Sequence, residues 1–180
     1  LHQQIDRSLQ VAVSVALSAV GRGQPQGHAH HALGLGPGLF GPGGVGKSMV
    51  AASIALLVAS GRGAIGTLEG ERSRVLYLDW EADQIVHAER LRALSRGLDQ
   101  PYERGLILYR RMQGPLASAM TQIKRLVAKH GIGLLVVDSM TPARGSSDQG
   151  GYESSAMKLF DALRTLELPA LIVDHVSKAS

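Results

Sequence analysis

The octapeptide GPGGVGKS at residues 41–48 constrains the fold of this chain more than any other segment. It follows the pattern G-x-x-x-x-G-K-[ST] in full and leads into a predicted helix at 45–60, which Gly61 closes. Glycines let backbone N–H groups curl around phosphate oxygens, and the start of a helix adds its positive dipole end. The segment therefore predicts a phosphate-binding loop that leads directly into a helix.

The polar residues of this loop match the groups of a nucleoside triphosphate. Lys47 would place a positive charge on the β- and γ-phosphates, and Ser48 would offer a hydroxyl ligand to Mg²⁺. We therefore expect ATP and Mg²⁺ as ligands, with Lys47 also serving catalysis. The residues expected to contact the nucleotide are Gly41, Pro42, Gly43, Gly44, Val45, Gly46, Lys47, Ser48 and Met49.

Predicted strands and helices alternate along the chain from position 39 onward. The run IGLLVVD at 132–138 is almost wholly apolar, which is typical of a strand that is covered on both faces. The other predicted elements are strands at 75–79, 106–109 and 169–174 and helices at 45–60, 82–96, 116–130 and 154–166. This alternation predicts an α/β domain over 33–180, with a mostly parallel central sheet flanked by helices.

Composition fits one globular domain and excludes several classes of site. The chain has 180 residues, of which 44% are hydrophobic and 19% are charged. It has no cysteine, which excludes disulfides, thiolate nucleophiles and cysteine-bound zinc or iron–sulfur centres. The formal net charge of +4 permits an anionic partner without identifying one. No apolar run approaches the ~20 residues of a membrane span, so we expect no membrane partner.

The first 32 residues form a separate and poorly defined segment. Its apolar residues fit either a helix or a strand. The basic lead-in Arg7 is offset by Asp6, so a signal peptide is disfavoured and we expect a cytoplasmic location. The histidines at 28, 30 and 31 offer metal ligands, but a polar linker is the simpler interpretation because no further ligand lies nearby.

Acidic residues follow two of the predicted strands. Asp138 ends an apolar strand, at the edge of a parallel sheet where ligands bind, and we expect it to hold Mg²⁺ through water. The next residue is Ser139 rather than a glutamate, so the base that activates water must come from elsewhere. Glu81 is the best candidate, at the end of an earlier strand. Asp79 and Asp83 are rivals, although Asp79 lies within the strand and Asp83 is well placed as a helix cap.

A third polar group follows the last predicted strand, in the segment DHVSK at 174–178. His175 is placed to sense the γ-phosphate by a hydrogen bond, and we expect a catalytic role for it. A hydrogen-bonded core histidine is the alternative. Lys178 is expected to reach a phosphate in the same or a neighbouring subunit.

These segments carry a family resemblance. GPGGVGKS, VLYLDWEAD, LLVVDS and ALIVDHVSK, in this order and spacing, resemble the RecA-like P-loop ATPases over about residues 39–180. The likeness is greatest to the branch around the RepA-type hexameric replicative helicases of plasmids and phages. In that family the glutamate that matches Glu81 is the catalytic base. The residues that match His175 and Lys178 belong to the sensor and inter-subunit region.

The resemblance also implies an arrangement and an assembly. The strands of Glu81 and Asp138 would lie side by side, and the strand of His175 would lie between those of Asp138 and the phosphate loop. We expect a homo-oligomer, with a hexamer as one form. The chain departs from the family pattern before the loop, where residues 30–40 lack an apolar run. Because it starts with Leu1 and stops at Ser180, we expect a core that is truncated on its C-terminal side.

Evidence for nucleic acid in the sequence is limited. The polar, glycine-rich segment 141–151 follows the Asp138 strand and is predicted to be a loop, with Arg144 as its one basic residue. Single-stranded DNA is a possible partner of this loop. Residues 71–130 hold 11 basic and 7 acidic residues, which is most simply a solvated surface.

Three functional hypotheses follow. The first is a DNA helicase or helicase-like ATPase in the replication of a mobile element. The second is an ATP-dependent regulator or loader whose assembly is switched by nucleotide without unwinding. A small-molecule kinase is disfavoured, because no arginine-rich lid segment follows the predicted sheet.

Overall fold

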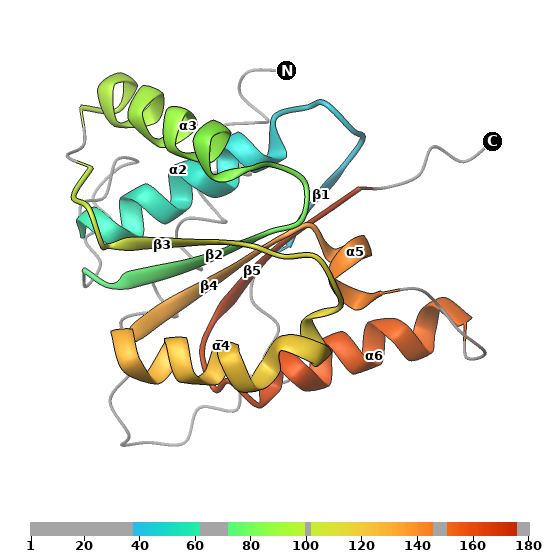
Figure 1. Cartoon of the computed structure of the whole chain (residues 1–180). Helices are drawn as coiled ribbons and strands as arrows, with labels where there is room; N and C mark the ends of the chain where they lie inside the picture. Colours follow the sequence, from blue (N-terminus) through green and yellow to red (C-terminus); the bar gives the residue numbers. More distant parts are fainter. Residues whose placement is uncertain (1–37, 62–71, 100–101, 146–150, 176–180) are drawn as a thin grey trace, which may run out of the picture.

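Five parallel strands form one sheet in the computed structural model, which describes residues 38–61, 72–99, 102–145 and 151–175 (Figure 1). They are β1 (Gly38–Gly41), β2 (Arg74–Asp79), β3 (Ile107–Arg111), β4 (Ile132–Asp138) and β5 (Ala170–His175). Their order is β1-β5-β4-β2-β3, and every neighbouring pair is parallel. The predicted α/β fold and the strand neighbours implied by the resemblance are confirmed. The segment 1–32 and Lys178 lie outside the described residues.

Helices cover both faces of the sheet because the chain crosses it in two directions. α2 (Lys47–Ser60) and α3 (Gln84–Gly97) accompany the outward path from β1 to β3 and lie on one face (Figure 1). α4 (Leu116–His130) and α6 (Gly151–Arg164) accompany the return path and lie on the other. Right-handed crossovers require this change of face when the direction reverses. Within the described ranges, no helix is long and apolar enough to cross a lipid bilayer.

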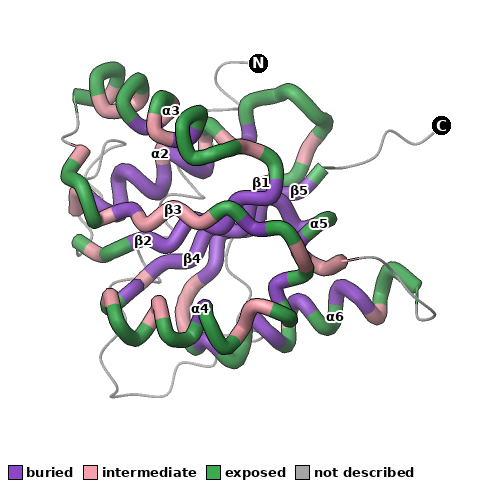
Figure 2. The backbone as a smooth tube through the Cα atoms, viewed as in Figure 1, coloured by how far each residue is buried: buried purple, intermediate pink, exposed green. Residues whose placement is uncertain are grey.

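Alternating side chains of the central strands build one core on each face. Figure 2 shows that the central strands of the sheet consist mostly of buried residues. In β4, Leu134 and Val136 pack in the core of α2 and α3, whereas Leu135 and Val137 pack in the core of α4 and α6. All four side chains are fully buried. Removing a side chain of this size from water contributes about 1.5–3 kcal/mol. The continuous apolar run of β4 therefore reflects a strand buried on both faces.

Two predicted helix boundaries near the candidate site were wrong. α2 begins at Lys47 rather than at position 45, because Gly46 has a left-handed backbone (φ 87°) that cannot continue a helix. α3 begins at Gln84, after Asp83, whose side chain accepts hydrogen bonds from the N–H groups of the first helical turn. The predicted cap role of Asp83 is confirmed. At its other end, α3 extends one residue beyond the predicted range and includes Gly97.

The strand of the phosphate loop, which the resemblance implies, is present, and one expectation about the segment after β4 was wrong. The segment before the phosphate loop ends in a short strand, β1, which pairs through its backbone with β5 and exposes 62% of Phe40. Pairing through the backbone requires no long apolar run. The predicted loop at 141–151 is helical at its start, where the five-residue helix α5 (Met140–Arg144) buries Met140 and Ala143 in the core under α4 and α6. Their i, i+3 spacing puts both on one helical face.

His87 is a buried polar residue of α3. Its ring lies between Tyr77 and Tyr109, with ring centroids 4.4 and 4.6 Å away. Neither ring nitrogen has a hydrogen-bond partner in the described part of the chain. Burial, with a smaller contribution from the charge of Arg90, lowers the pKa of His87 from 6.5 to about 4. The ring is therefore neutral at pH 7 and packs as an aromatic group.

We expect His87 to destabilise the protein as the pH falls from 6.5 toward 4. The unfolded chain takes up a proton there that the folded chain does not, which removes about 3 kcal/mol at pH 4. His87→Phe keeps a ring between the two tyrosines and abolishes the proton uptake. Urea unfolding of both proteins between pH 7 and pH 4 measures the difference. Parallel pH profiles would contradict this assignment.

We expect Ile123→Ala in α4 to lower the free energy of unfolding by about 2–5 kcal/mol, because this fully buried side chain fills the core on that face. The neighbouring exposed residue supplies the control: Lys124→Ala should change stability by less than about 0.5 kcal/mol. Chemical denaturation measures both. Equal effects would mean that α4 does not pack on the sheet through Ile123.

Candidate nucleotide-binding site

The phosphate loop connects β1 to α2 and has the backbone of an anion site. Gly44 and Gly46 have left-handed φ angles of 76° and 87°, which side chains other than glycine rarely adopt. A Cβ at either position would meet no atom within 4 Å, so backbone conformation rather than space requires glycine. Gly46 caps α2 without a side-chain hydrogen bond. The first N–H groups of the helix therefore lack the cap that a serine or aspartate would supply.

Lys47 is 8% exposed and folds back over its own loop. Its Nζ donates hydrogen bonds to the carbonyl oxygens of Gly41 (2.9 Å) and Pro42 (2.6 Å), and it lies 3.3 Å from Nδ1 of His175. An ammonium has three N–H groups, so these contacts use all of them. A phosphate oxygen is a stronger acceptor than a neutral carbonyl and can take their place.

The parallel register brings the predicted acidic residues to one edge of the sheet. Asp138 at the end of β4 pairs with Asp79 at the end of β2, and β5 on the other side ends at His175. Asp138 is 1% exposed. Its Oδ2 accepts a 2.7 Å hydrogen bond from the hydroxyl of Tyr77. Its buried Oδ1 has no partner among the described residues, so one oxygen remains for a ligand.

Glu81 lies two residues beyond β2 and is held through one of its two oxygens. Its Oε1 accepts a 2.8 Å hydrogen bond from Oγ of Ser139 and lies 3.0 Å from Nε2 of His175. The side chain remains 47% exposed, and Oε2 makes no hydrogen bond within the described ranges. The carboxylate is therefore oriented and still has an acceptor available. The Asp138–Ser139 peptide bond is cis.

His175 joins Lys47 to Glu81. Because an ammonium can only donate, the contact with Lys47 requires an unprotonated Nδ1. The proton then lies on Nε2, which donates to Glu81. The structure thus brings together three of the predicted catalytic residues, from β5, from the start of α2 and from the turn after β2.

The two rivals of Glu81 have other contacts. Asp79 is 1% exposed, and its Oδ1 accepts 2.8 Å hydrogen bonds from the N–H groups of Glu81 and Ala82. Burial is the largest cause that raises the pKa of Asp79, and the charge of Asp138 adds to it. Asp83 uses its side chain to cap α3. Of the three acids, Glu81 is the one whose exposed carboxylate is held by other side chains rather than by the backbone of its own turn.

A cavity of about 400 Å³ opens beside the loop. It is lined by Ser48, Asp79, Glu81, Ala82, Asp83, Val86, Arg90 and Asp138. The described residues include no group of three or more acids or histidines placed to hold a metal ion together. Mg²⁺ typically binds through one or two carboxylates, water and substrate phosphates. Ser48 and the unpartnered oxygen of Asp138 therefore fit Mg²⁺ that arrives with a nucleotide.

Sequence reasoning missed three residues of this region. Tyr77 was assigned to the strand pattern, and its bond to Asp138 depends on the pairing of β2 with β4. Ser139 was noted only for not being glutamate, although its hydroxyl holds Glu81. Arg90 was counted with a solvated face, whereas it lines the cavity. The available signal was helical spacing: Arg90 lies seven residues after Asp83, the cap of α3, and therefore on the same side of the helix.

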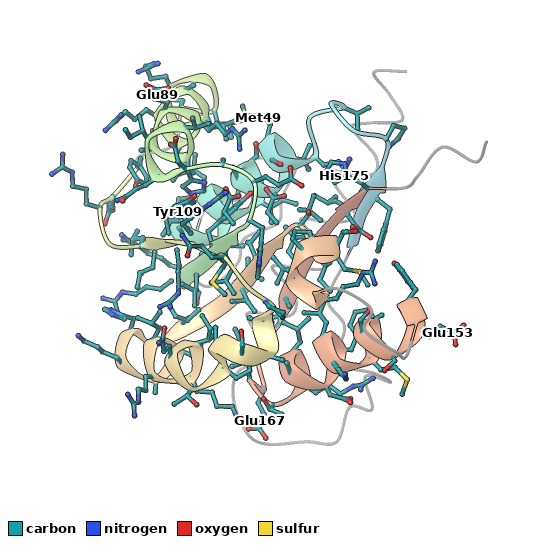
Figure 3. All side chains as sticks on the ribbon, turned by 45° about the vertical axis from the view of Figure 1, so that its right-hand side comes forward. Met49, Glu89, Tyr109, Glu153, Glu167 and His175 are labelled. Atoms are coloured by element: carbon teal, nitrogen blue, oxygen red, sulfur yellow. The ribbon has the colours of Figure 1, made fainter. Side chains whose placement is uncertain are left out.

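The remaining predicted residues are at the rim or outside the described chain. Val45 is 60% exposed on the loop, and Met49 is 38% exposed in the first turn of α2. Figure 3 shows Met49 and His175 near the same edge of the sheet. Glu167 lies far from them, beyond α6. Lys178 is outside the described residues.

Comparison with known families agrees with this geometry. The model of an AAA domain family matches residues 37–180. No curated protein matches the chain. The match extends over the phosphate loop and all five strands. The chain therefore belongs to this AAA domain family, a family of P-loop ATPases.

Proposed function

We propose that this chain binds ATP with Mg²⁺ and hydrolyses the β–γ phosphoanhydride bond, with Glu81 as the general base. The observation that carries the proposal is the carboxylate of Glu81. Ser139 and His175 orient it through Oε1, while Oε2 has no hydrogen bond to any residue that the structure describes, and the side chain lines the cavity that Ser48 and Asp138 share. A base of this kind needs a fixed position and a free lone pair.

Each polar residue has a role in the proposed reaction. The loop N–H groups and Lys47 bind the β- and γ-phosphates, and Ser48 and Asp138 hold Mg²⁺, which neutralises charge on the phosphates when bound. Glu81 Oε2 accepts a proton from water as the water oxygen attacks the γ-phosphorus. The bond to the bridging oxygen breaks, and ADP leaves with that oxygen. The proton on Glu81 passes to solvent.

His175 is proposed to report phosphate binding to the base. Its ring touches Lys47 at one nitrogen and Glu81 at the other. When a phosphate draws Lys47 away, Nδ1 of His175 loses its donor, so the hydrogen bond to Glu81 changes in strength. Lys178 is proposed to contact a phosphate in the same subunit or a neighbouring one.

The wider proposal is a homo-oligomeric DNA helicase or helicase-like motor in the replication of a mobile element. It is supported by the resemblance of four ordered motifs to RepA-type helicases. The AAA domain match supports the ATPase part of the proposal alone. Arg144, at the end of α5, is the basic residue of the segment after β4, and its guanidinium lies over the ring of Tyr152 and donates to Ser155. The competing candidate is a regulator whose assembly is switched by ATP.

We expect Glu81→Gln to bind ATP normally and to lower turnover by about 10²–10⁴-fold, because an amide keeps the shape and cannot take a proton. The matched control is Glu89→Gln on the exposed side of α3, which should stay within about twofold of the unchanged chain. Steady-state phosphate release and titration with a fluorescent ATP analogue measure both properties. Wild-type turnover in Glu81→Gln would show that the base lies elsewhere.

We expect ATP turnover to rise more steeply than protein concentration and to increase further with single-stranded DNA, if neighbouring subunits complete the site. Phosphate release over a concentration series, with and without DNA, measures this. Lys47→Ala is the control and should lack ATP binding in every condition. Turnover that is strictly proportional to protein and indifferent to DNA would favour the regulator over the motor.

A further inference from the structure

Two buried carboxylate oxygens at the edge of the sheet have no hydrogen-bond partner. They are Oδ2 of Asp79 and Oδ1 of Asp138, and they belong to residues that pair directly across β2 and β4. Both side chains are 1% exposed, and both line the cavity that contains Ser48. Within the described part of the chain, no other buried carboxylate oxygen lacks a hydrogen-bond partner.

The positive groups near Asp79 leave its Oδ2 without a partner. Arg111 is 3.9 Å from the other oxygen, Oδ1, and its hydrogen bond goes to the backbone oxygen of Ala82. Arg90 lines the cavity but makes no ion pair with Asp79. A buried carboxylate oxygen without a donor or cation is unfavourable, and here the two residues that carry such oxygens line one cavity. A divalent cation would satisfy both oxygens.

We propose that Asp79 supplies a second carboxylate, through Oδ2, to the divalent cation that Ser48 and Asp138 hold. This rests on the proposed function, because the cation arrives with the nucleotide. The chemistry is appropriate, since Mg²⁺ takes oxygen ligands, often two carboxylates, and completes its shell with water and phosphate. Asp138 presents one available oxygen because Tyr77 occupies the other. Asp79 likewise presents one, because the turn occupies its Oδ1.

Asp79 therefore has two separate tasks, one for each oxygen. Oδ1 fixes the backbone of Glu81, and Oδ2 faces the cation. One rigid carboxylate thus links the metal to the turn that carries the base. A substitution that spares Oδ1 and replaces Oδ2 separates the two tasks.

Asp79→Asn is that substitution. Its amide oxygen can keep the hydrogen bonds from Glu81 and Ala82, while its NH₂ group cannot ligate a cation. The measurement is Mn²⁺ binding in the presence of ADP, followed by electron paramagnetic resonance. We expect the affinity for Mn²⁺ to fall about tenfold or more, and metal-free ADP binding to stay unchanged.

Asp83→Asn is the matched control. Asp83 lines the same cavity and accepts two backbone hydrogen bonds through Oδ1, but it is exposed. We expect its Mn²⁺ affinity to stay within about twofold of the unchanged chain. Unchanged Mn²⁺ affinity in Asp79→Asn would overturn the inference and leave the proposed ATPase standing. If the wild-type chain binds neither ADP nor Mn²⁺, the proposed function and this inference are both overturned.

A second variant covers the case in which Asp79→Asn fails to fold. The chain has no cysteine, so Asp79→Cys introduces a single thiol. With Cd²⁺ and ADP, a thiolate ligand gives an ultraviolet charge-transfer band, and Asp83→Cys should give none. A band at position 79 alone supports the assignment. Its absence in a folded Asp79→Cys protein contradicts it.

Discussion

Parallel strand pairing is the constraint on which the site depends. Because β2, β4 and β5 run in the same direction, their carboxyl ends meet at one edge, and the last residues of all three are polar. Upstream of these ends, most residues of the strands are apolar and buried. A one-residue slip of β4 against β2 would turn Asp138 toward the opposite face. The two cores therefore fix the positions of the acids as well as the stability of the fold.

Neighbouring aromatic side chains near the site combine packing with hydrogen bonding. Tyr77 uses its hydroxyl on Asp138, and its ring packs on His87, which in turn packs on Tyr109. The hydroxyl of Tyr109 donates to the backbone of Ala82, next to Glu81. The rings of Tyr77, His87 and Tyr109 therefore connect Asp138, at the end of β4, to the turn that carries Glu81. Packing and polar positioning are thus served by the same rings.

Local patterns in the sequence predicted the parts of the fold that local physics decides. The bounds of α4 and β4 were predicted as the structure has them, because each is set by a strong apolar period and by the glycine between them. β1 was implied only by the resemblance and α5 was missed, since one is held by backbone pairing with a distant strand and the other by burial of Met140 and Ala143. Strand ends in the sequence predicted Asp138, Glu81 and His175 as site residues. Their position at one edge of the sheet depends on the strand order, which cannot be predicted from the apolar periodicity of the sequence.

The folded-back position of Lys47 has a consequence for ligand choice. Its three N–H groups are already satisfied by two carbonyls of its own loop and by His175. These contacts hold Lys47 against its own loop and against the end of β5. Occupation becomes an exchange of acceptors, and only a more strongly charged acceptor gains by it. Under the proposed function, Lys47 would thus discriminate by charge, because a phosphate group with more negative charge would displace the carbonyl oxygens more readily.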